Sequence, residues 1–247
     1  MKKVGLIGHG YWGKILHQKL KYLSDIKFIC TSKDNYESKL KDVEWVFVAT
    51  TNESHYEIVK NCILAEKNVF CEKPLTMTYE KSLELCELAK SKGVKLFIDE
   101  VFWYRSELID VHKFLSHNPK HIKCVWLKND RTSHTDSFYD LMYHDLYLLQ
   151  IHLQNKPMSS VKEIDLNNKI HLLVNFKDIE VEFLYDRCSE ENTHYISGVN
   201  LTRTTEDALA KMIKQVLQGS VIFEYNQDRG LFANKMIDDI KKSIKDD

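Results

Sequence analysis

The sequence predicts an α/β protein of two domains, in which a doubly wound parallel sheet is followed by a smaller α+β domain with a mostly antiparallel sheet. Three observations support this fold class. The chain has 247 residues, more than one domain usually contains. Short apolar runs alternate with helical patterns in its first half, and segments typical of strands, joined by short turns, fill its second half. We expect the boundary near Asn118, giving domains of residues 1–118 and 119–247.

In the first domain, the apolar runs and the helical patterns alternate regularly. The expected strands are residues 4–7, 26–30, 45–49, 68–71 and 94–98. The expected helices are residues 15–23, 56–65 and 79–91. Because strands that read as continuous apolar runs are buried on both faces, this sheet is predicted to be parallel and covered by helices on both sides.

In the second domain, the pattern changes to strands with short polar turns. The expected strands are residues 121–128, 161–166, 170–176, 179–185 and 194–201, with turns at 167–169 and 177–178. Residues 131–139 are polar and typical of a loop, and helices are expected at 140–153, 206–217 and 231–244. Strands joined by such short turns pair antiparallel.

The composition narrows the class of partner. Lys and Arg number 35 against 36 Asp and Glu, so neither a nucleic acid nor an anionic membrane is expected to bind. No apolar run approaches the roughly 18–20 residues of a membrane helix, and we expect a cytoplasmic protein with a small-molecule ligand. The six cysteines are scattered without a C-x-x-C pair, which favours free thiols and no metal site.

Glycine carries the sharpest local signal. Only eight residues are glycine, yet four of them lie between positions 5 and 13. Gly8, Gly10 and Gly13 form a G-x-G-x-x-G motif between an apolar run and a helical pattern, which is typical of a Rossmann dinucleotide-binding turn. The following helix would present its first N–H groups to a pyrophosphate, with Tyr11 and Trp12 beside it; a purely structural glycine turn is the alternative.

The end of the second expected strand bears on which nicotinamide cofactor binds. An acidic residue there binds the adenosine ribose in NAD-preferring proteins. This strand runs out instead into Thr31, Ser32 and Lys33, which can accommodate a 2′-phosphate. Since the first acid, Asp34, is expected to lie one turn too late, the sequence favours NADP; NAD remains the alternative if the strand boundary is shifted by two residues.

Several further segments resemble the Gfo/Idh/MocA family of oxidoreductases. They are residues 49–55 (ATTNESH), the E-K-P triplet at 72–74, Tyr104-Arg105, and Asp140-x-x-x-His144. With the glycine motif, they follow the family order over most of the chain. The resemblance implies an NAD(P)-dependent dehydrogenase or reductase that acts on a sugar, a sugar nucleotide or a cyclic polyol. It also implies a homo-oligomer, a dimer or a tetramer, that associates through the open face of the second sheet.

The resemblance assigns roles to individual residues. Lys73 would hold the reacting oxygen and His144 would exchange its proton, as hydride transfer from an alcohol requires. Asp140, four residues before His144 on a predicted helix, would orient the imidazole from the same helical face. Candidate substrate-binding residues are Lys73, Tyr104, Arg105, Tyr143 and His144, and further cofactor-binding candidates are Thr50, Thr51, Asn52, His55, Glu72 and Lys73.

The sequence also departs from the family pattern. Thr51 stands where proline is frequent, and Met142-Tyr143 replaces a small glycine, so Tyr143 is expected to reshape the pocket. The second domain is shorter than in typical relatives. Two other functions therefore stay open: a catalytically inactive dinucleotide-binding regulator or scaffold, and a reductase of the biliverdin type on the same fold.

Overall fold

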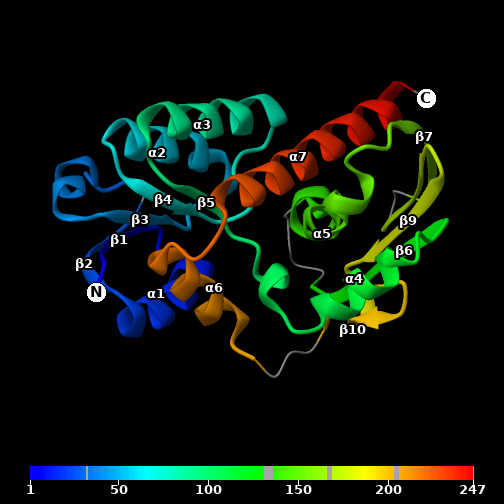
Figure 1. Cartoon of the computed structure of the whole chain (residues 1–247), viewed down its shortest axis with the longest axis horizontal. Coiled ribbons are helices and arrows are strands. Elements are labelled where there is room, and N and C mark those ends of the chain that lie inside the picture. Colours follow the sequence, from blue (N-terminus) through cyan, green and yellow to red (C-terminus); the bar gives the residue numbers. More distant parts are fainter. Residues whose placement is uncertain (32, 131–135, 166–168, 203–205, 247) are drawn as a thin grey trace. The chain divides into compact units, whose positions relative to one another are not determined.

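The computed structural model describes residues 1–31, 33–130, 136–165, 169–202 and 206–246 (Figure 1). Two compact units emerge: Met1–Val101 with Ala208–Asn234, and Phe102–Asp207 with Lys235–Asp247. This division differs from the expected boundary at residue 118. Residues 102–118 lie in the second unit, and 208–234 return to the first because their helices contact its helix α1 and its strand β5.

The first unit contains a five-stranded parallel sheet, as predicted. Its strands are β1 (Lys3–Ile7), β2 (Asp25–Cys30), β3 (Trp45–Val48), β4 (Asn68–Cys71) and β5 (Leu96–Ile98), in the order β2-β1-β3-β4-β5. Every residue of β3 is buried. Phe47, Phe70 and Phe97 stack across three neighbouring strands, with ring centroids 4.7 and 5.5 Å apart. The continuous apolar runs thus form the central layer of this unit.

Helices cover both faces of this sheet (Figure 1). Helices α2 (Asn52–Leu64) and α3 (Tyr79–Lys92) pack together on one side, and α1 (Tyr11–Leu23) and α6 (Ala208–Gln218) on the other. The ends of α3 have local causes. The Thr78 side chain accepts a hydrogen bond from the Lys81 backbone N–H at its start, and Gly93 adopts a left-handed conformation at its end.

The second unit contains a six-stranded sheet that is mostly antiparallel, as predicted. Its strands are β6 (His121–Asn129), β7 (Met158–Asp165), β8 (Ile170–Phe176), β9 (Ile179–Asp186), β10 (Cys188–Ile196) and β11 (Val199–Asn200), in the order β11-β10-β6-β9-β8-β7. Only the described pair β6 and β9 runs parallel. Strands β8 and β9 bury every second residue, so one face of the sheet forms a core with α5 (Tyr143–Leu153).

Four predictions of local structure were incomplete. The strand expected at 194–201 is interrupted by a turn at Ser197-Gly198, where both residues have positive φ, so it forms the β10–β11 hairpin. The helix expected from residue 140 begins as a π-helical turn, η3 (Phe138–Met142). Helix α7 (Phe223–Asp246) begins before residue 231. Three short helices were not predicted: η1 (Glu37–Asp42), η2 (Val101–Tyr104) and α4 (Leu108–Ser116).

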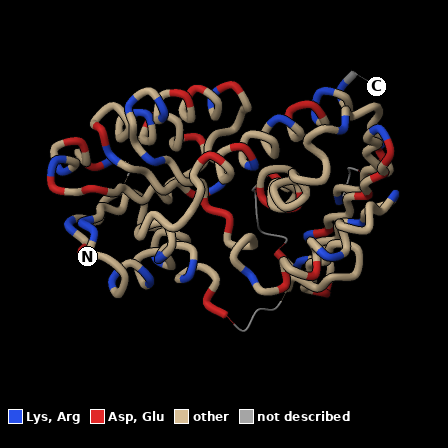
Figure 2. The backbone as a smooth tube through the Cα atoms, viewed as in Figure 1, with Lys and Arg blue, Asp and Glu red and all other residues tan. Residues whose placement is uncertain are grey.

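Neither the charged side chains nor the cysteines are concentrated in one part of the described structure. Acidic and basic residues are interspersed along both units (Figure 2). The cysteines are free thiols, and five are buried while Cys188 is exposed. Within the described ranges, no helix is long and apolar enough to cross a membrane, and no group of three potential ligands is arranged to hold a metal ion.

Candidate functional site

The glycine turn between β1 and α1 has two positions that exclude a side chain. Gly8 has a φ of +99°, and a Cβ atom there would lie 2.2 Å from the Ala49 carbonyl oxygen. A Cβ atom at Gly13 would lie 2.1 Å from the Gly8 carbonyl oxygen. The first and third glycines are therefore required by the close approach of α1 and β3 to the turn.

Gly10 differs, because a Cβ atom there would meet nothing within 4 Å. It is the N-cap of α1, where no side chain caps the helix, and the described first turn of α1 contains no acidic residue. The first turn of the helix thus has open space at Gly10, no side-chain cap from that residue and a helix dipole that favours an anion. Tyr11 and Trp12 are 75% and 51% exposed beside them. These features fit the pyrophosphate of a dinucleotide.

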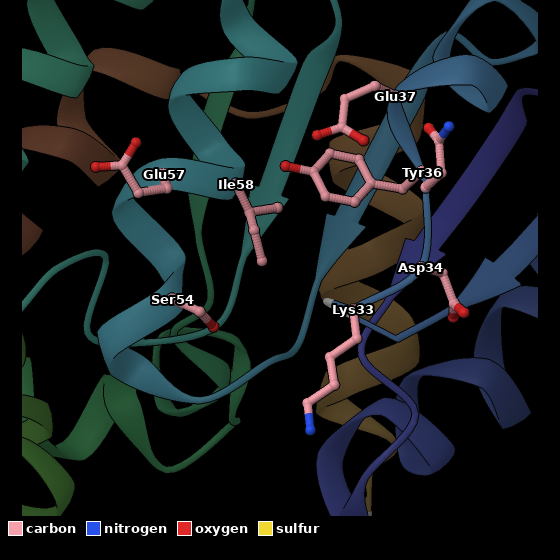
Figure 3. A pocket seen from close by; sticks show the side chains of 8 residues that line it. Lys33, Asp34, Tyr36, Glu37, Ser54, Glu57 and Ile58 are labelled. Carbon is pink, nitrogen blue, oxygen red and sulfur yellow. The ribbon is translucent and has the colours of Figure 1, made fainter.

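A cavity of about 570 Å³ lies at the end of β2 (Figure 3). Ser54 and Ile58 from α2 point toward the loop that follows β2, and Glu57 of the same helix also lines the cavity. The complete lining is Lys33, Asp34, Asn35, Tyr36, Glu37, Ser54, Glu57 and Ile58. The sequence predicted Lys33 here, whereas Ser32 lies outside the described residues. Tyr36, Glu37 and Glu57 were not predicted, because no motif marks them.

Asp34 reaches back to the end of β2. Its carboxylate accepts hydrogen bonds from the backbone N–H of Thr31 at 2.6 Å and from the Thr31 hydroxyl at 3.0 Å. These two hydrogen bonds lower the pKa of Asp34. The carboxylate therefore lies beside Thr31, closer to the strand end than the sequence position of Asp34 suggests. In Figure 3, the side chains of Lys33 and Asp34 leave the loop in different directions.

The turn after β3 lies next to the glycine turn. Ala49 donates its backbone N–H to Ile7 at 2.8 Å, and its carbonyl touches Gly8. Thr51 is the N-cap residue of α2, and the Thr50 hydroxyl accepts a hydrogen bond from Ser54 at 2.8 Å. Thr50 and Asn52 are half-buried, and Thr51 is exposed. The structure thus brings these three predicted cofactor-binding residues and the glycine turn to one sheet edge.

His55, a predicted cofactor-binding residue, does not contact solvent. Its side chain is fully buried, and its Nδ1 lies 2.9 Å from the Pro74 carbonyl oxygen. Burial lowers the pKa of His55, so the imidazole is neutral. The ring is therefore tied to the turn that immediately follows Lys73.

Lys73 lies directly after β4, half-buried and adjacent to buried acids. Glu72 is 8% exposed, and burial raises its pKa to about 7, while Lys73 partly opposes that shift. Burial and Glu72 raise the pKa of the neighbouring Asp99. Glu72 and Asp99 hydrogen-bond to each other through their side chains. Glu72, a predicted cofactor-binding residue, is therefore directed into the protein beside Asp99.

In the second unit, Asp140 has a partner that the sequence did not reveal. Its carboxylate forms an ion pair with Arg187, which also donates to Asp130 at 2.6 Å and to the Ser137 hydroxyl at 2.8 Å. Asp140 belongs to the π-turn η3, whereas His144 belongs to α5. The expected α-helical spacing between Asp140 and His144 is therefore altered, because a π-turn contains more residues than an α-turn.

His144 packs among aromatic rings of its own unit. It is 7% exposed, and its ring centroid lies 4.8 Å from that of Phe102 and 5.6 Å from that of Trp126. The guanidinium of Arg105 lies over the Phe102 ring, 3.9 Å from its centroid. It also donates a hydrogen bond to the Leu201 carbonyl. The structure thus brings together Arg105 and His144, two of the predicted substrate-binding residues, around Phe102.

Two predicted substrate-binding tyrosines are buried. Tyr104 is 9% exposed. Tyr143 is fully buried, with Tyr147 and His144 as ring neighbours at 6.5 and 6.4 Å. Tyr143, which was expected to reshape the pocket, packs inward at the start of α5. The sequence analysis also missed a cluster of Asp145, Tyr185 and His194. Asp145 forms hydrogen bonds with Tyr185, 40 positions later in the chain, and with His194, 49 positions later.

Comparisons with known proteins match part of the chain. Residues 16–100 match the family described as "Oxidoreductase family, NAD-binding Rossmann fold". The chain is 28% identical over 177 residues to scyllo-inositol 2-dehydrogenase (NADP(+)) IolW of Bacillus subtilis, covering 58% of this chain and 49% of that protein. It is 49% identical over 55 residues to 1,5-anhydro-D-fructose reductase of Ensifer adhaerens, covering 22% and 16%. The chain thus spans at most about half the length of these curated relatives.

Solved structures resemble nearly the whole chain at low sequence identity. UDP-N-acetylglucosamine 3-dehydrogenase GnnA from Acidithiobacillus ferrooxidans has a TM-score of 0.83 at 17% identity, covering 98% of this chain and 97% of that one. The WlbA dehydrogenase from Thermus thermophilus, in complex with NAD and UDP-GlcNAcA, has a TM-score of 0.76 at 13% identity, covering 96% and 95%. At these identities, the likeness establishes the two-sheet fold.

Proposed function

Residues 16–100 of this chain belong to the Gfo/Idh/MocA family of oxidoreductases with an NAD-binding Rossmann fold, and on this premise we propose that the chain transfers a hydride between NAD(P) and a substrate carbon. The substrate would be a sugar, a sugar nucleotide or a cyclic polyol, at a hydroxyl or keto carbon. The main observation that supports this function is the turn from Gly8 to Gly13. The turn leaves space at Gly10, on the same edge of the sheet as Lys73. The names of the relatives support this range of substrates.

The chain's own residues would manage the proton and the oxygen. When bound, the nicotinamide accepts or supplies the hydride. The ammonium of Lys73 would hold the reacting oxygen by a charge-assisted hydrogen bond. The imidazole of His144 would take the hydroxyl proton in oxidation and return it in reduction. Asp140 would act on His144 from its ion pair with Arg187, which fixes the carboxylate within the π-turn.

A spectrophotometric screen tests this function. The purified chain is mixed with NADH or NADPH, or with their oxidised forms, and with UDP-N-acetylglucosamine, scyllo-inositol or 1,5-anhydro-D-fructose. We expect turnover of nicotinamide with at least one compound of these three classes. Tight binding of the cofactor without any turnover would contradict the proposal and support a dinucleotide-binding regulator or scaffold instead.

For the cofactor, we propose NADP first and NAD second. Lys33 lines the cavity at the end of β2, where its ammonium can bind a 2′-phosphate. The NADP-linked name of the Bacillus subtilis relative agrees with this choice. The Asp34 carboxylate beside Thr31 favours NAD, because it can accept hydrogen bonds from the ribose hydroxyls and repels a phosphate.

Two single substitutions separate these cofactors by their dissociation constants. If NADP is preferred, Lys33→Ala weakens NADPH binding about tenfold and leaves NADH binding unchanged, since one charge-assisted hydrogen bond is lost. If NAD is preferred, Asp34→Asn weakens NADH binding instead. Fluorescence titration of both reduced cofactors measures the constants. Equal binding of NADH and NADPH by the unmodified chain would refute the proposed preference for NADP.

A further inference from the structure

Asp145 is a buried acid that the proposed reaction does not use directly. It lies on α5, and its side chain is fully buried. One carboxylate oxygen accepts a hydrogen bond from the Tyr185 hydroxyl at 2.7 Å, and the other lies 2.7 Å from Nε2 of His194. Tyr185 is on β9 and His194 on β10, the two strands on either side of β6. Asp145 therefore connects α5 to two separate strands.

The protonation pattern of this cluster follows from its surroundings. Burial, followed by the Asp145 carboxylate, raises the pKa of Tyr185 well above its usual value, so its hydroxyl stays protonated and donates. Burial, followed by the charge of Asp145, also raises the pKa of Cys124, a buried thiol on β6. Nε2 of His194 and an oxygen of Asp145 form the second hydrogen bond of the cluster. A buried carboxylate is stable only with such partners.

The same cluster shares its aromatic neighbours with His144. The Phe102 ring centroid lies 4.8 Å from that of His144 and 5.0 Å from that of His194. Trp126 stacks on His194 at 3.9 Å, with the planes inclined by 10°, and contacts His144 at 5.6 Å. The two imidazoles therefore contact the same pair of rings.

Helix geometry links Asp145 to the orientation of His144. Consecutive residues of an α-helix point about 100° apart around its axis. When the Asp145 side chain is held by β9 and β10, the rotation of α5 about its axis is fixed, and with it the direction of His144. On the preceding π-turn, Arg187 holds Asp140 in the same manner. Two anchored carboxylates thus lie on either side of His144 along the chain.

We propose that Asp145 is a positioning residue for His144, held in place by the hydrogen-bonded chain Tyr185–Asp145–His194. This inference rests on the proposed function, in which His144 exchanges the proton. Tyr185 and His194 act through Asp145, and none of the three residues exchanges the proton with the substrate. Their effect is to hold the imidazole of His144 in the orientation that proton exchange needs.

The first test needs neither substrate nor cofactor. The full chain is labelled with ¹⁵N-histidine, and the signals of His144 and His194 are assigned from His144→Gln and His194→Gln. The pH titration of His144 is then compared in Asp145→Asn, Tyr185→Phe and Glu182→Gln. Glu182 is the matched control, because this carboxylate also lies on β9 and accepts two hydrogen bonds, from Lys123 and His171, but has no contact with α5 among the described hydrogen bonds.

We expect Asp145→Asn to lower the pKa of His144 by about half a unit or more, because it removes a neighbouring negative charge. Tyr185→Phe leaves the charge unchanged, so a shift of the His144 signals in that variant reports a change of position alone. Glu182→Gln is expected to match the unmodified chain. Unfolding curves of each variant verify that it is folded at the temperature of the titration. His144 signals that are the same in all three variants would overturn the proposal.

The second test uses turnover with UDP-N-acetylglucosamine, or with whichever compound of the screen reacts. Misplacement of a reacting group lowers the rate by about ten- to a hundredfold. We expect kcat to fall by that factor in Asp145→Asn and several-fold in Tyr185→Phe, with unchanged NADPH affinity. Unchanged kcat in both variants would contradict the inference. If no compound reacts, the proposed function fails, and the titration still decides whether Asp145 positions His144.

Discussion

At the residue scale, Lys73 is a half-buried side chain whose neighbours in the chain are buried. It follows β4 directly, the buried ring of His55 holds the carbonyl of Pro74, and the carboxyl groups of Glu72 and Asp99 lie buried beside it. The backbone around the ammonium is thus fixed by buried hydrogen bonds, while the side chain itself is half-buried. Such an arrangement holds a charged group in one place without enclosing it.

We predict that Lys73→Met and His144→Asn each lower kcat strongly. Loss of a positioned acid–base or oxygen-binding group typically costs about 10²–10⁴ in rate. The affinity for NADPH should change less than threefold, because the phosphates would bind to the glycine turn. Steady-state kinetics and fluorescence titration measure both quantities. The control is Lys92→Met at the exposed end of α3, and a Lys73 variant as active as this control would exclude the assigned role.

The buried acid Glu72 predicts a pH dependence of stability. Its pKa is about 7 in the folded chain, raised by burial above the ordinary value of 4.5. The protonated form thus stabilises the fold below about pH 4.5, and this contribution is lost as the pH rises through 7. We expect the free energy of unfolding to fall by at most about 3 kcal/mol between pH 5 and 8 from this group.

Urea denaturation at several pH values tests this dependence by comparison with Glu72→Gln. The variant cannot lose a proton at this position, so its stability should decline less than that of the unmodified chain over the same range. The burial of His55, whose pKa is lowered, acts in the opposite direction below about pH 6.5 in both proteins and cancels in the comparison. Parallel curves for the two proteins would contradict the prediction.

For single residues, the sequence predicted where the turn glycines lie better than it predicted which side chains bind to each other. Gly8 and Gly13 were identified because the motif states a steric requirement, which the close backbone contacts confirm. The Asp34 carboxylate was placed too far from β2, since a side chain that turns back to Thr31 leaves no trace in the spacing. Asp140 was predicted to act on His144 from helical spacing, and its ion pair with Arg187, which is distant in sequence, left no signal in that spacing.

At the scale of elements, the start of α7 protects the edge of the first sheet. Asn226 donates from its side chain to the Ile98 carbonyl and accepts from the Ile98 N–H, both at 2.8 Å. Gln227 donates to the Leu96 carbonyl at 2.9 Å. These amides take the place of a further strand beside β5, so that the backbone groups of an edge strand are satisfied.

We therefore predict that Asn226→Ala destabilises the chain by about 1–3 kcal/mol, because two buried backbone groups of Ile98 lose their partners. Urea denaturation measures the change in the free energy of unfolding. Gln218→Ala, which removes an exposed amide at the end of α6, is the control and should cost less than about 0.5 kcal/mol. Equal stability of the two variants would show that water can replace Asn226.

The sequence predicted the long elements and missed the irregular ones for identifiable reasons. Continuous apolar runs and alternating patterns marked the strands of both sheets, because burial imposes these periods. The Ser197-Gly198 turn had a signal, a dipeptide typical of tight turns, within a segment assigned to one strand. The π-turn η3 had none, because its residues are compatible with an ordinary helix and tertiary contacts such as Arg187–Asp140 hold it.

At the scale of the whole molecule, the outward face of the second sheet is rich in paired charges. Glu182 accepts hydrogen bonds from Lys123 and His171 at 3.0 and 2.9 Å, and His121 lies 3.1 Å from Glu180. Leu184 lies on the same face, half-buried, directly opposite His171. We propose that this face joins copies of the chain into a dimer or a tetramer.

Light scattering at micromolar concentration is expected to give the mass of such an oligomer. Leu184→Lys should yield a monomer, because a charge placed within a packed interface is costly. The control is Leu64→Lys, which alters an exposed leucine on α2 of the first unit and should leave the mass unchanged. A monomeric mass for the unmodified chain would refute the proposed association.

The two units divide the chain within α7, and this division affects how the chain folds during synthesis. The first unit comprises residues 1–101 and 208–234, so its final helical segments are synthesised only after the whole of Phe102–Asp207. Until Asn226 leaves the ribosome, the edge of β5 has no amide to occupy it, and it resembles the unpaired edges at which nascent chains associate wrongly. Translation therefore delays the completion of the first unit, and chaperones that shield strand edges during synthesis would act on this edge longest.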